Sequence, residues 1–116
     1  MMTLPSSVKV YVAVEPVDMR KGFDGLGNIV RHQFKHDVLS GHLFAFFNRR
    51  RDRAKILFWD RSGFAIFYKR LEKGRFTVPD GFVSPVEMEP AELGLLLEGI
   101  DLRGAKKRER WVPTSK

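Results

Sequence analysis

Residues 42–71, HLFAFFNRRRDRAKILFWDRSGFAIFYKRL, decide the fold of this chain. Three runs rich in aromatic and β-branched residues, at 42–48, 54–60 and 64–71, are separated by short polar stretches. Such runs are typical of β-strands, and the polar stretches have the length and the Asn, Asp and Gly content of hairpin turns. The sequence therefore predicts an antiparallel meander of strands over this range.

The residues before the meander predict one more strand and a helix. The alternating run 8–14 favours a strand, and Pro16 ends it. Apolar residues then recur at helical spacing to about residue 35. This spacing predicts a helix that begins near Met19, with Asp18 as its N-cap.

The residues after the meander predict a short strand, a helix and a tail. We expect a short fourth meander strand at 75–78, and a second helix that starts at Pro90 and ends before Gly99. The buried stripe of that helix is predicted to be Leu93, Leu96, Leu97 and Ile100. Residues 103–116 are polar and basic, as in a flexible tail. The prediction is a single α+β domain over 1–102, with a mostly antiparallel β-meander sheet, a helix after the first strand and a C-terminal helix.

Composition limits the class of protein. The chain has 116 residues and no cysteine, so it is large enough for a hydrophobic core and excludes disulfides and thiolate metal sites. Residues 1–7 lack the basic and apolar regions of a signal peptide, and no apolar run is long enough to span a bilayer. We therefore expect a cytoplasmic protein with no membrane partner.

The net charge of +7 is unevenly distributed. Five basic residues and one acidic residue lie in 49–55, four and one in 69–75, and six and one in 103–116, whereas 80–101 has six acidic residues and no basic one. This segregation predicts one side that faces a polyanion and a separate acidic side. The alternative is a basic surface that serves only solubility.

Meander topology brings two of the basic segments together. The first and third turns of an up-and-down sheet fall at the same end, so the Arg-rich turn after Asn48 should approach the turn at 72–74. Clustered cations favour a polyanion that relieves their repulsion, and Arg guanidinium groups suit phosphate oxygens. The alternative is that polar hairpin tips are simply solvated. The candidate nucleic-acid-binding residues at this end are Arg49, Arg50, Arg51, Arg53, Lys55, Lys69, Arg70, Lys73 and Arg75.

Arg20 and Lys21 form a second candidate site for phosphate. They fall in the predicted first helical turn, where cations oppose the helix dipole but free backbone N–H groups favour an anion. Two exposed bases that point away from any ligand explain the same residues equally well.

Both faces of the predicted sheet are apolar. Alternation places Phe44 and Phe46 on one face, with Leu43 and Phe47 on the other. We expect one face to be ordinary core. The other is expected to be covered either by the second helix or by a second copy of the chain in a homodimer.

The sequence shows no pattern for catalysis, a metal or a cofactor. His32 and His36 have a spacing that zinc ligands on a helix can have, but Arg31 and Lys35 beside them would repel a cation. The carboxylates mostly occupy capping and turn positions, and no phosphate-binding Gly loop or nucleophile elbow occurs. We therefore expect a binding protein and not an enzyme, with no cofactor and no metal site.

Several motifs, in consistent order over residues 8–102, resemble one family. They are PVDMRKGFDGL at 16–26, SGHLF at 40–44, NRRRDR at 48–53, YKRLEKGRF at 68–76 and LLLEGIDL at 95–102. Together they resemble the TnpB-type accessory proteins, which are the second open-reading-frame products of the insertion sequence 66 family of bacterial transposable elements.

The resemblance implies a role in transposition beside a separate transposase that carries the catalytic residues, and it assigns no catalytic residue to this chain. The leading hypothesis is a non-catalytic accessory protein that binds the DNA of the element ends and contacts the transposase and the other accessory protein. Two alternatives stay open: a protein-interaction adaptor without direct DNA contact, and a regulator of the element's expression.

Overall fold

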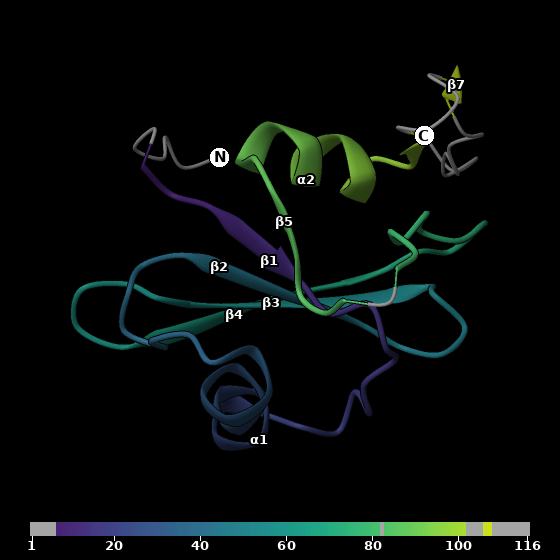
Figure 1. Ribbon diagram of the computed structural model, residues 1–116. Coiled ribbons are helices and arrows are strands. Elements are labelled where there is room, and N and C mark those ends of the chain that lie inside the picture. Colours follow the sequence, from purple (N-terminus) through teal and green to yellow (C-terminus); the bar gives the residue numbers. More distant parts are fainter. Residues whose placement is uncertain (1–6, 82, 102–105, 108–116) are drawn as a thin grey trace.

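The computed structural model describes residues 7–81, 83–101 and 106–107, and its centre is a five-stranded mixed β-sheet (Figure 1). The strands are β1 (Val10–Val12), β2 (Leu43–Phe47), β3 (Arg53–Trp59), β4 (Phe64–Arg70) and β5 (Val86–Met88). Their order across the sheet is β4-β3-β2-β1-β5. The helices α1 (Phe23–Asn28) and α2 (Pro90–Leu97) lie on opposite faces, so the sheet is the middle of three layers.

The three strands predicted at 42–48, 54–60 and 64–71 are confirmed as β2, β3 and β4. They form consecutive antiparallel pairs, as expected for hairpins. The predicted first strand is also present, but β1 pairs parallel to β2. A parallel pair needs a crossover connection, and here the helical segment between β1 and β2 provides it. The sheet is therefore mixed and not a simple meander.

The fourth meander strand predicted at 75–78 is wrong. Within the described residues this segment pairs with no strand. Phe76 and Val78, only 1% and 3% exposed, bury their side chains in the core beneath α2. The alternate burial of side chains gives this segment the sequence pattern of a strand, although its backbone forms no strand pairing in the described part of the chain. The additional strand is β5, which pairs antiparallel with β1 at residues for which no strand was predicted.

The first helix begins later than predicted. α1 starts at Phe23 with Gly22 at its N-cap, and no side chain caps it. Asp18, the predicted cap, instead accepts hydrogen bonds from Arg20. The helical segment continues as a π-helical turn, η1 (Ile29–Phe34).

The second helix matches its prediction. α2 starts at Pro90, and a capping box precedes it, in which the side chains of Glu89 and Glu92 each accept a hydrogen bond from the other residue's backbone N–H. Leu93 and Leu96 are buried as expected. Leu97 is partly buried against the same cluster, and the side chain of Ile100 lies outside the described part of the chain.

Two apolar clusters fill the space between the layers. Beneath α1, the sheet contributes Phe44, Phe46 and Leu57. Beneath α2, it contributes alternate residues of the same strands, including Phe47 and Ile56. Helices therefore cover both faces of β2 and β3. For these strands the second apolar face is covered by the second helix and not by a second copy of the chain.

The edge strand β4 differs from its neighbours. Its side chains Phe64, Phe67 and Tyr68 remain 38%, 49% and 48% exposed, whereas those of β2 are all buried. In the described part of the chain, apolar surface of the sheet is therefore left uncovered along part of this edge.

Among the described residues, no helix has the length and apolar composition needed to cross a membrane. Within the predicted tail 103–116, only Lys106–Lys107 is described, as the strand β7, which pairs antiparallel with β6 (Ile100–Asp101). The rest of that predicted tail lies outside the described residues.

Candidate nucleic-acid interface

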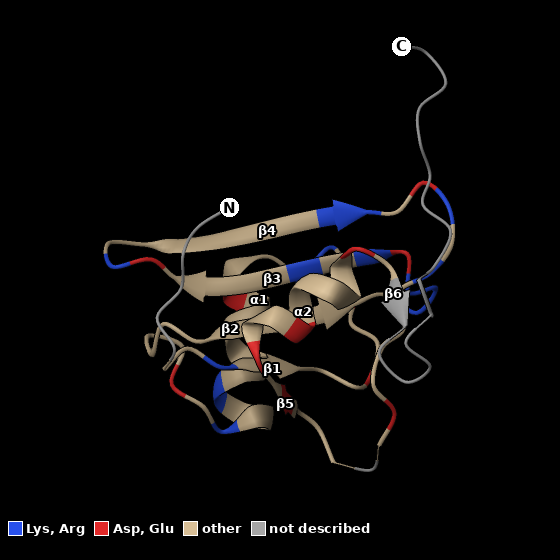
Figure 2. Ribbon diagram, turned by 90° about the horizontal axis from the view of Figure 1, so that it is seen from above, with Lys and Arg blue, Asp and Glu red and all other residues tan. Residues whose placement is uncertain are grey.

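Two backbone hydrogen bonds join the Arg-rich turn to the turn that follows β4. The N–H of Leu71 donates to the carbonyl of Asp52 at 2.7 Å, and the N–H of Phe76 donates to the carbonyl of Arg51 at 2.6 Å. The prediction that these turns lie at one end of the sheet is therefore confirmed. Figure 2 shows Lys and Arg gathered at this end of β3 and β4. We define the basic rim as Arg49, Arg50, Arg51, Arg53, Lys73 and Arg75.

Asn48 organises the Arg-rich turn. Its side-chain oxygen accepts hydrogen bonds from the N–H groups of Asp52 and Arg53, both at 3.0 Å. Its side-chain amide donates to the Asp52 carboxylate at 2.7 Å, and its backbone carbonyl accepts from the N–H of Arg51 at 3.0 Å. The turn is closed by its own polar groups, so the Arg side chains are not needed to hold it together.

Arg51 adopts a backbone conformation that non-glycine residues rarely take. Its φ angle of 60° lies in the left-handed region, which costs a residue with a Cβ about 1 kcal/mol. Arg61, in the turn at the opposite end of β3 and β4, has φ 55°. These two positions give a matched pair of strained arginines, one on the basic rim and one away from it.

The rim arginines are largely uncommitted within the protein. Among the described residues, Arg49, Arg50, Arg51 and Arg75 form no ion pair. Arg53 donates to the hydroxyl of Tyr68 at 3.3 Å. The hydrogen bond from Asn48 lowers the pKa of Asp52, and Arg53 and Arg50 lower it further. The one carboxylate in the turn is thus ionised and already hydrogen-bonded.

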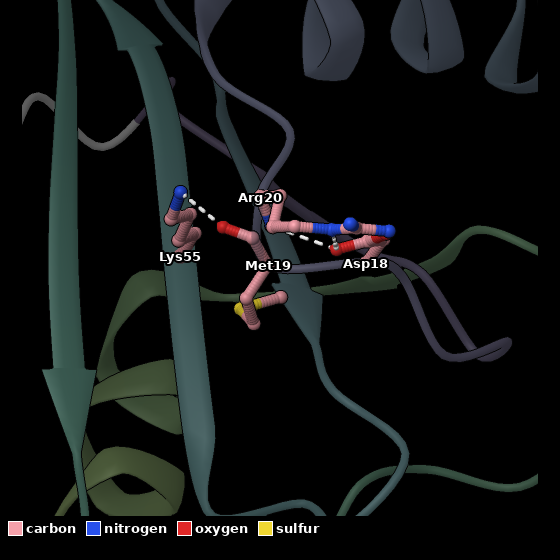
Figure 3. A network of polar contacts seen from close by, with 4 residues as sticks. All are labelled: Asp18, Met19, Arg20 and Lys55. Carbon is pink, nitrogen blue, oxygen red and sulfur yellow. Dashed lines mark hydrogen bonds and ion pairs between the residues drawn. The ribbon is translucent and has the colours of Figure 1, made fainter.

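Three of the predicted binding cations are used inside the molecule. The Lys55 ammonium donates to the carbonyl of Met19 at 2.7 Å (Figure 3). It also donates to the carbonyl of Lys21 at 3.0 Å and lies 5.0 Å from the centre of the Tyr68 ring. Lys55 therefore fastens the loop before α1 to β3. Its charge is directed at backbone carbonyls and an aromatic ring.

Lys69 and Arg70 also have internal partners. Lys69 donates to the carbonyl of Leu97 at 2.9 Å and lies 3.6 Å from the Glu98 carboxylate, so it satisfies the C-terminal end of α2. Arg70 pairs with Glu72 at 2.9 Å. Both cations adjoin the basic rim but are neutralised next to it.

The second candidate site lies in the loop before α1. Arg20 donates through its guanidinium and its backbone N–H to the carboxylate of Asp18 (Figure 3). This pairing holds the pKa of Asp18 at about 2, below its ordinary 3.8. Because α1 begins at Phe23, Arg20 and Lys21 are not in its first turn, and the expected combination of helix N–H groups and cations is absent at these two residues.

A hollow of about 480 Å³ brings the two candidate segments together. The backbone N–H of Val17 donates to the carbonyl of Phe47 at 2.9 Å, which holds the loop against the end of β2. The two carboxylates in the hollow are hydrogen-bonded to Arg20 and Asn48, and three arginines, Arg49, Arg50 and Arg53, line it beside them. Such a hollow suits anionic oxygens. It is lined by Pro16, Val17, Asp18, Met19, Asn48, Arg49, Arg50, Asp52 and Arg53.

Sequence reasoning missed the residues that shape this site. Asn48 and Asp52 were treated only as turn residues, yet they form the hydrogen bonds that present the arginines. The signal was available, because an Asn at the start of a turn commonly bonds to the backbone that follows it. Tyr68 gave no such signal, since its contacts with Arg53 and Lys55 depend on pairing between strands.

The described residues contain no group of three or more His, Cys, Asp or Glu side chains placed to hold a metal ion. His36, half of the histidine pair considered above, lies with its ring centre 4.0 Å from that of Tyr11.

Comparisons with known proteins give one family model and two close relatives. A family model described as "IS66 Orf2 like protein" matches residues 8–107. Two proteins of Sinorhizobium fredii (strain NBRC 101917 / NGR234) are similar along nearly their whole length. Uncharacterized protein y4hO is 39% identical over 96% of both chains, and uncharacterized protein y4jC is 35% identical over 92% of both. No solved structure matches the chain.

Proposed function

Because the chain belongs to the family of IS66 Orf2-like proteins, and is therefore an insertion-sequence protein, we propose that it is a non-catalytic accessory factor of transposition that binds DNA through the basic rim. Family membership supports the biological setting. The rim supports the mode of action, since the described residues offer a cationic surface and no constellation of catalytic groups.

The observation that carries the DNA-binding proposal is the joining of the two turns. The hydrogen bonds Leu71 to Asp52 and Phe76 to Arg51 hold cations from distant parts of the sequence at one end of the sheet. Like charges at contact repel by about 1 kcal/mol per pair even in water. A polyanion removes this repulsion, and the planar guanidinium forms paired hydrogen bonds with phosphate oxygens.

The shape of the rim favours contact with the DNA backbone. The rim residues lie in two turns, at the start of β3 and just after the second turn, and no helix among them could enter a major groove. We therefore propose that its arginines contact phosphates and carry little sequence information. Affinity that falls steeply with salt concentration is the expected signature.

The test is a binding series on duplex DNA from the element's terminal inverted repeats, measured by fluorescence anisotropy across salt concentrations. Log affinity falls linearly with log salt concentration, and each lost phosphate contact makes this slope shallower by about 0.9. The triple variant Arg49→Ala, Arg50→Ala, Arg75→Ala should therefore reduce the slope by about 3.

The matched control is Arg61→Ala, which removes an exposed arginine from the opposite end of the same two strands. It should leave the slope unchanged. An equal loss of slope in the triple variant and in Arg61→Ala, or no loss in the triple variant, would contradict binding through the rim.

We further propose that exposed acidic residues of β5 and α2 contact the transposase. Glu87 on β5 and Glu92 on α2 are exposed, and both lie outside the basic rim. This is also the surface that a protein-interaction adaptor without DNA contact would use. Co-purification with the transposase should be weakened by Glu87→Lys and unaffected by Asp60→Lys in a turn of the other edge. Retained co-purification without any DNA affinity would favour the adaptor.

A further inference from the structure

We propose that β4 pairs antiparallel with β4 of a second copy of this chain, which joins the two sheets into one continuous sheet. Among the described residues, β4 lies at the edge of the sheet and pairs only with β3 (Figure 2). Its register with β3 runs without interruption from Phe64 to Arg70. Within the described part of the chain, the backbone groups on the outer side of this seven-residue strand have no strand beside them.

The usual protections of an edge strand are missing along most of β4. Edges are commonly blocked by proline, by bulges or by charges spread along the strand. Phe64–Arg70 contains no proline and no glycine, and its charges are confined to Lys69 and Arg70 at one end. The opposite edge of the sheet, β5, has only three residues. The aromatic part of β4 is therefore the edge most suited to a further strand.

The hydrogen bonds at both ends of the β3–β4 pair show which groups point outward. The N–H of Leu71 donates to the carbonyl of Asp52, and the N–H of Asp60 donates to the carbonyl of Gly63. Bonded and non-bonded pairs alternate along an antiparallel ladder. The odd-numbered residues of β4 therefore bond to β3. The backbone groups that face away from β3 belong to Phe64, Ile66, Tyr68 and Arg70.

These outward groups are self-complementary in one register. With Phe67 on a two-fold axis, Phe64 lies opposite Arg70 of the second copy, and Ile66 lies opposite Tyr68. Every pair of outward-facing residues is then a hydrogen-bonded pair, and all four positions of each strand are satisfied. Phe67 meets its own counterpart as a non-bonded pair, in which side chains approach most closely.

The same register keeps like charges apart. Each Arg70 is offset from its counterpart by six positions, roughly 20 Å along the strand, and each Lys69 by four positions, roughly 13 Å. The half-exposed rings of Phe64, Phe67 and Tyr68 lie on both faces of the strand, so pairing covers apolar surface on both sides of the new junction. Exposed aromatic surface of this kind is what a stable contact removes from water.

Single cysteines test the register directly, because the natural chain has no cysteine. In Phe67→Cys the two Cα atoms across the axis would be about 4.5 Å apart, within the range that a disulfide spans. In Ala65→Cys, on the same face of the same strand, they would be offset by roughly 13 Å. Mild oxidation of the full-length chain should cross-link Phe67→Cys into dimers and leave Ala65→Cys monomeric. Cross-linking of both variants to the same extent would overturn the proposed register.

The mass of the unmodified chain tests the pairing itself. Sedimentation equilibrium should show a monomer–dimer equilibrium, and Phe67→Lys, which places two ammonium groups opposite each other, should weaken it by about tenfold or more. The control is Val83→Lys, which alters an exposed apolar residue away from β4 and should leave the equilibrium unchanged. A single monomer mass for the unmodified chain at all concentrations would overturn the proposal and leave the edge to a different protein.

Discussion

The backbone N–H of Phe76 donates a hydrogen bond to the carbonyl of Arg51, a residue twenty-five positions earlier in the chain. The Phe76 ring is also buried, and its centre lies 5.4 Å from that of Phe47 in the core. The residue that precedes Phe76 is the rim arginine Arg75. The spacing between cations on the two turns is therefore set by the packing of the core.

Asn48→Ala should destabilise the protein by about 2–3 kcal/mol, because it leaves partly buried N–H groups of Asp52 and Arg53 without an acceptor. Urea unfolding measures the change. Asn28→Ala, which removes a single exposed contact with Arg31, should cost less than about 0.5 kcal/mol. If the two variants unfold at the same urea concentration, Asn48 does not organise the turn.

Lys55→Met should lower stability without changing the number of DNA phosphate contacts. The variant keeps an apolar stem but loses two hydrogen bonds from a charged donor to the loop before α1, at a cost of about 1–3 kcal/mol. Thermal unfolding and the salt dependence of DNA binding are the two measurements. The control is Lys21→Met, in the same loop but exposed, which should leave stability unchanged. If Lys55→Met instead left stability unchanged and made DNA binding less dependent on salt, Lys55 would contact DNA.

Arg51→Gly should separate stability from DNA binding. Glycine adopts the left-handed conformation of this position freely, so the variant should gain up to about 1 kcal/mol of stability while losing a rim cation and hence DNA affinity. Arg61→Gly should bring a similar gain of stability with no loss of affinity, because Arg61 lies at the other end of β3 and β4. Equal affinity for the two variants would argue against a role for the rim.

Asp18 should titrate with a midpoint near pH 2, because Arg20 stabilises its charged form. The pKa in the folded chain lies below the ordinary value of 3.8, so the contribution of this pair to stability is present above about pH 4 and is lost as the pH falls towards 2. Carboxyl NMR of the folded protein measures the midpoint. Arg20→Gln should move it up towards the ordinary value, and an unchanged midpoint would exclude Arg20 as the cause.

The sequence predicted the central hairpins because their information is local. In 42–71 the alternation of apolar residues and the turn residues between them define the strands, their faces and the end of the sheet at which the Arg-rich turn lies. The family resemblance likewise depends on contiguous motifs, and the comparisons bear it out.

The errors in the sheet concern long-range pairing. The parallel contact between β1 and β2 and the short strand β5 depend on partners far away in the chain. The local pattern therefore could not show that 86–88 forms a strand and 75–78 does not. The same holds for Lys55 and Lys69, which counted as free cations in the sequence. Their ammonium groups turn to carbonyls of Met19 and Leu97, whose positions only the folded chain reveals.

The extended segment after β4 carries Arg75 on the rim and, within three residues, buries Phe76 and Val78 against Leu93 and Leu96 of α2. The segment that carries Arg75 and the helix α2 therefore share one set of packed side chains. If a partner that shifts α2 also shifts Arg75 and changes the affinity of the rim for its ligand, thermodynamic linkage requires that occupancy of the rim change the affinity for that partner by the same factor.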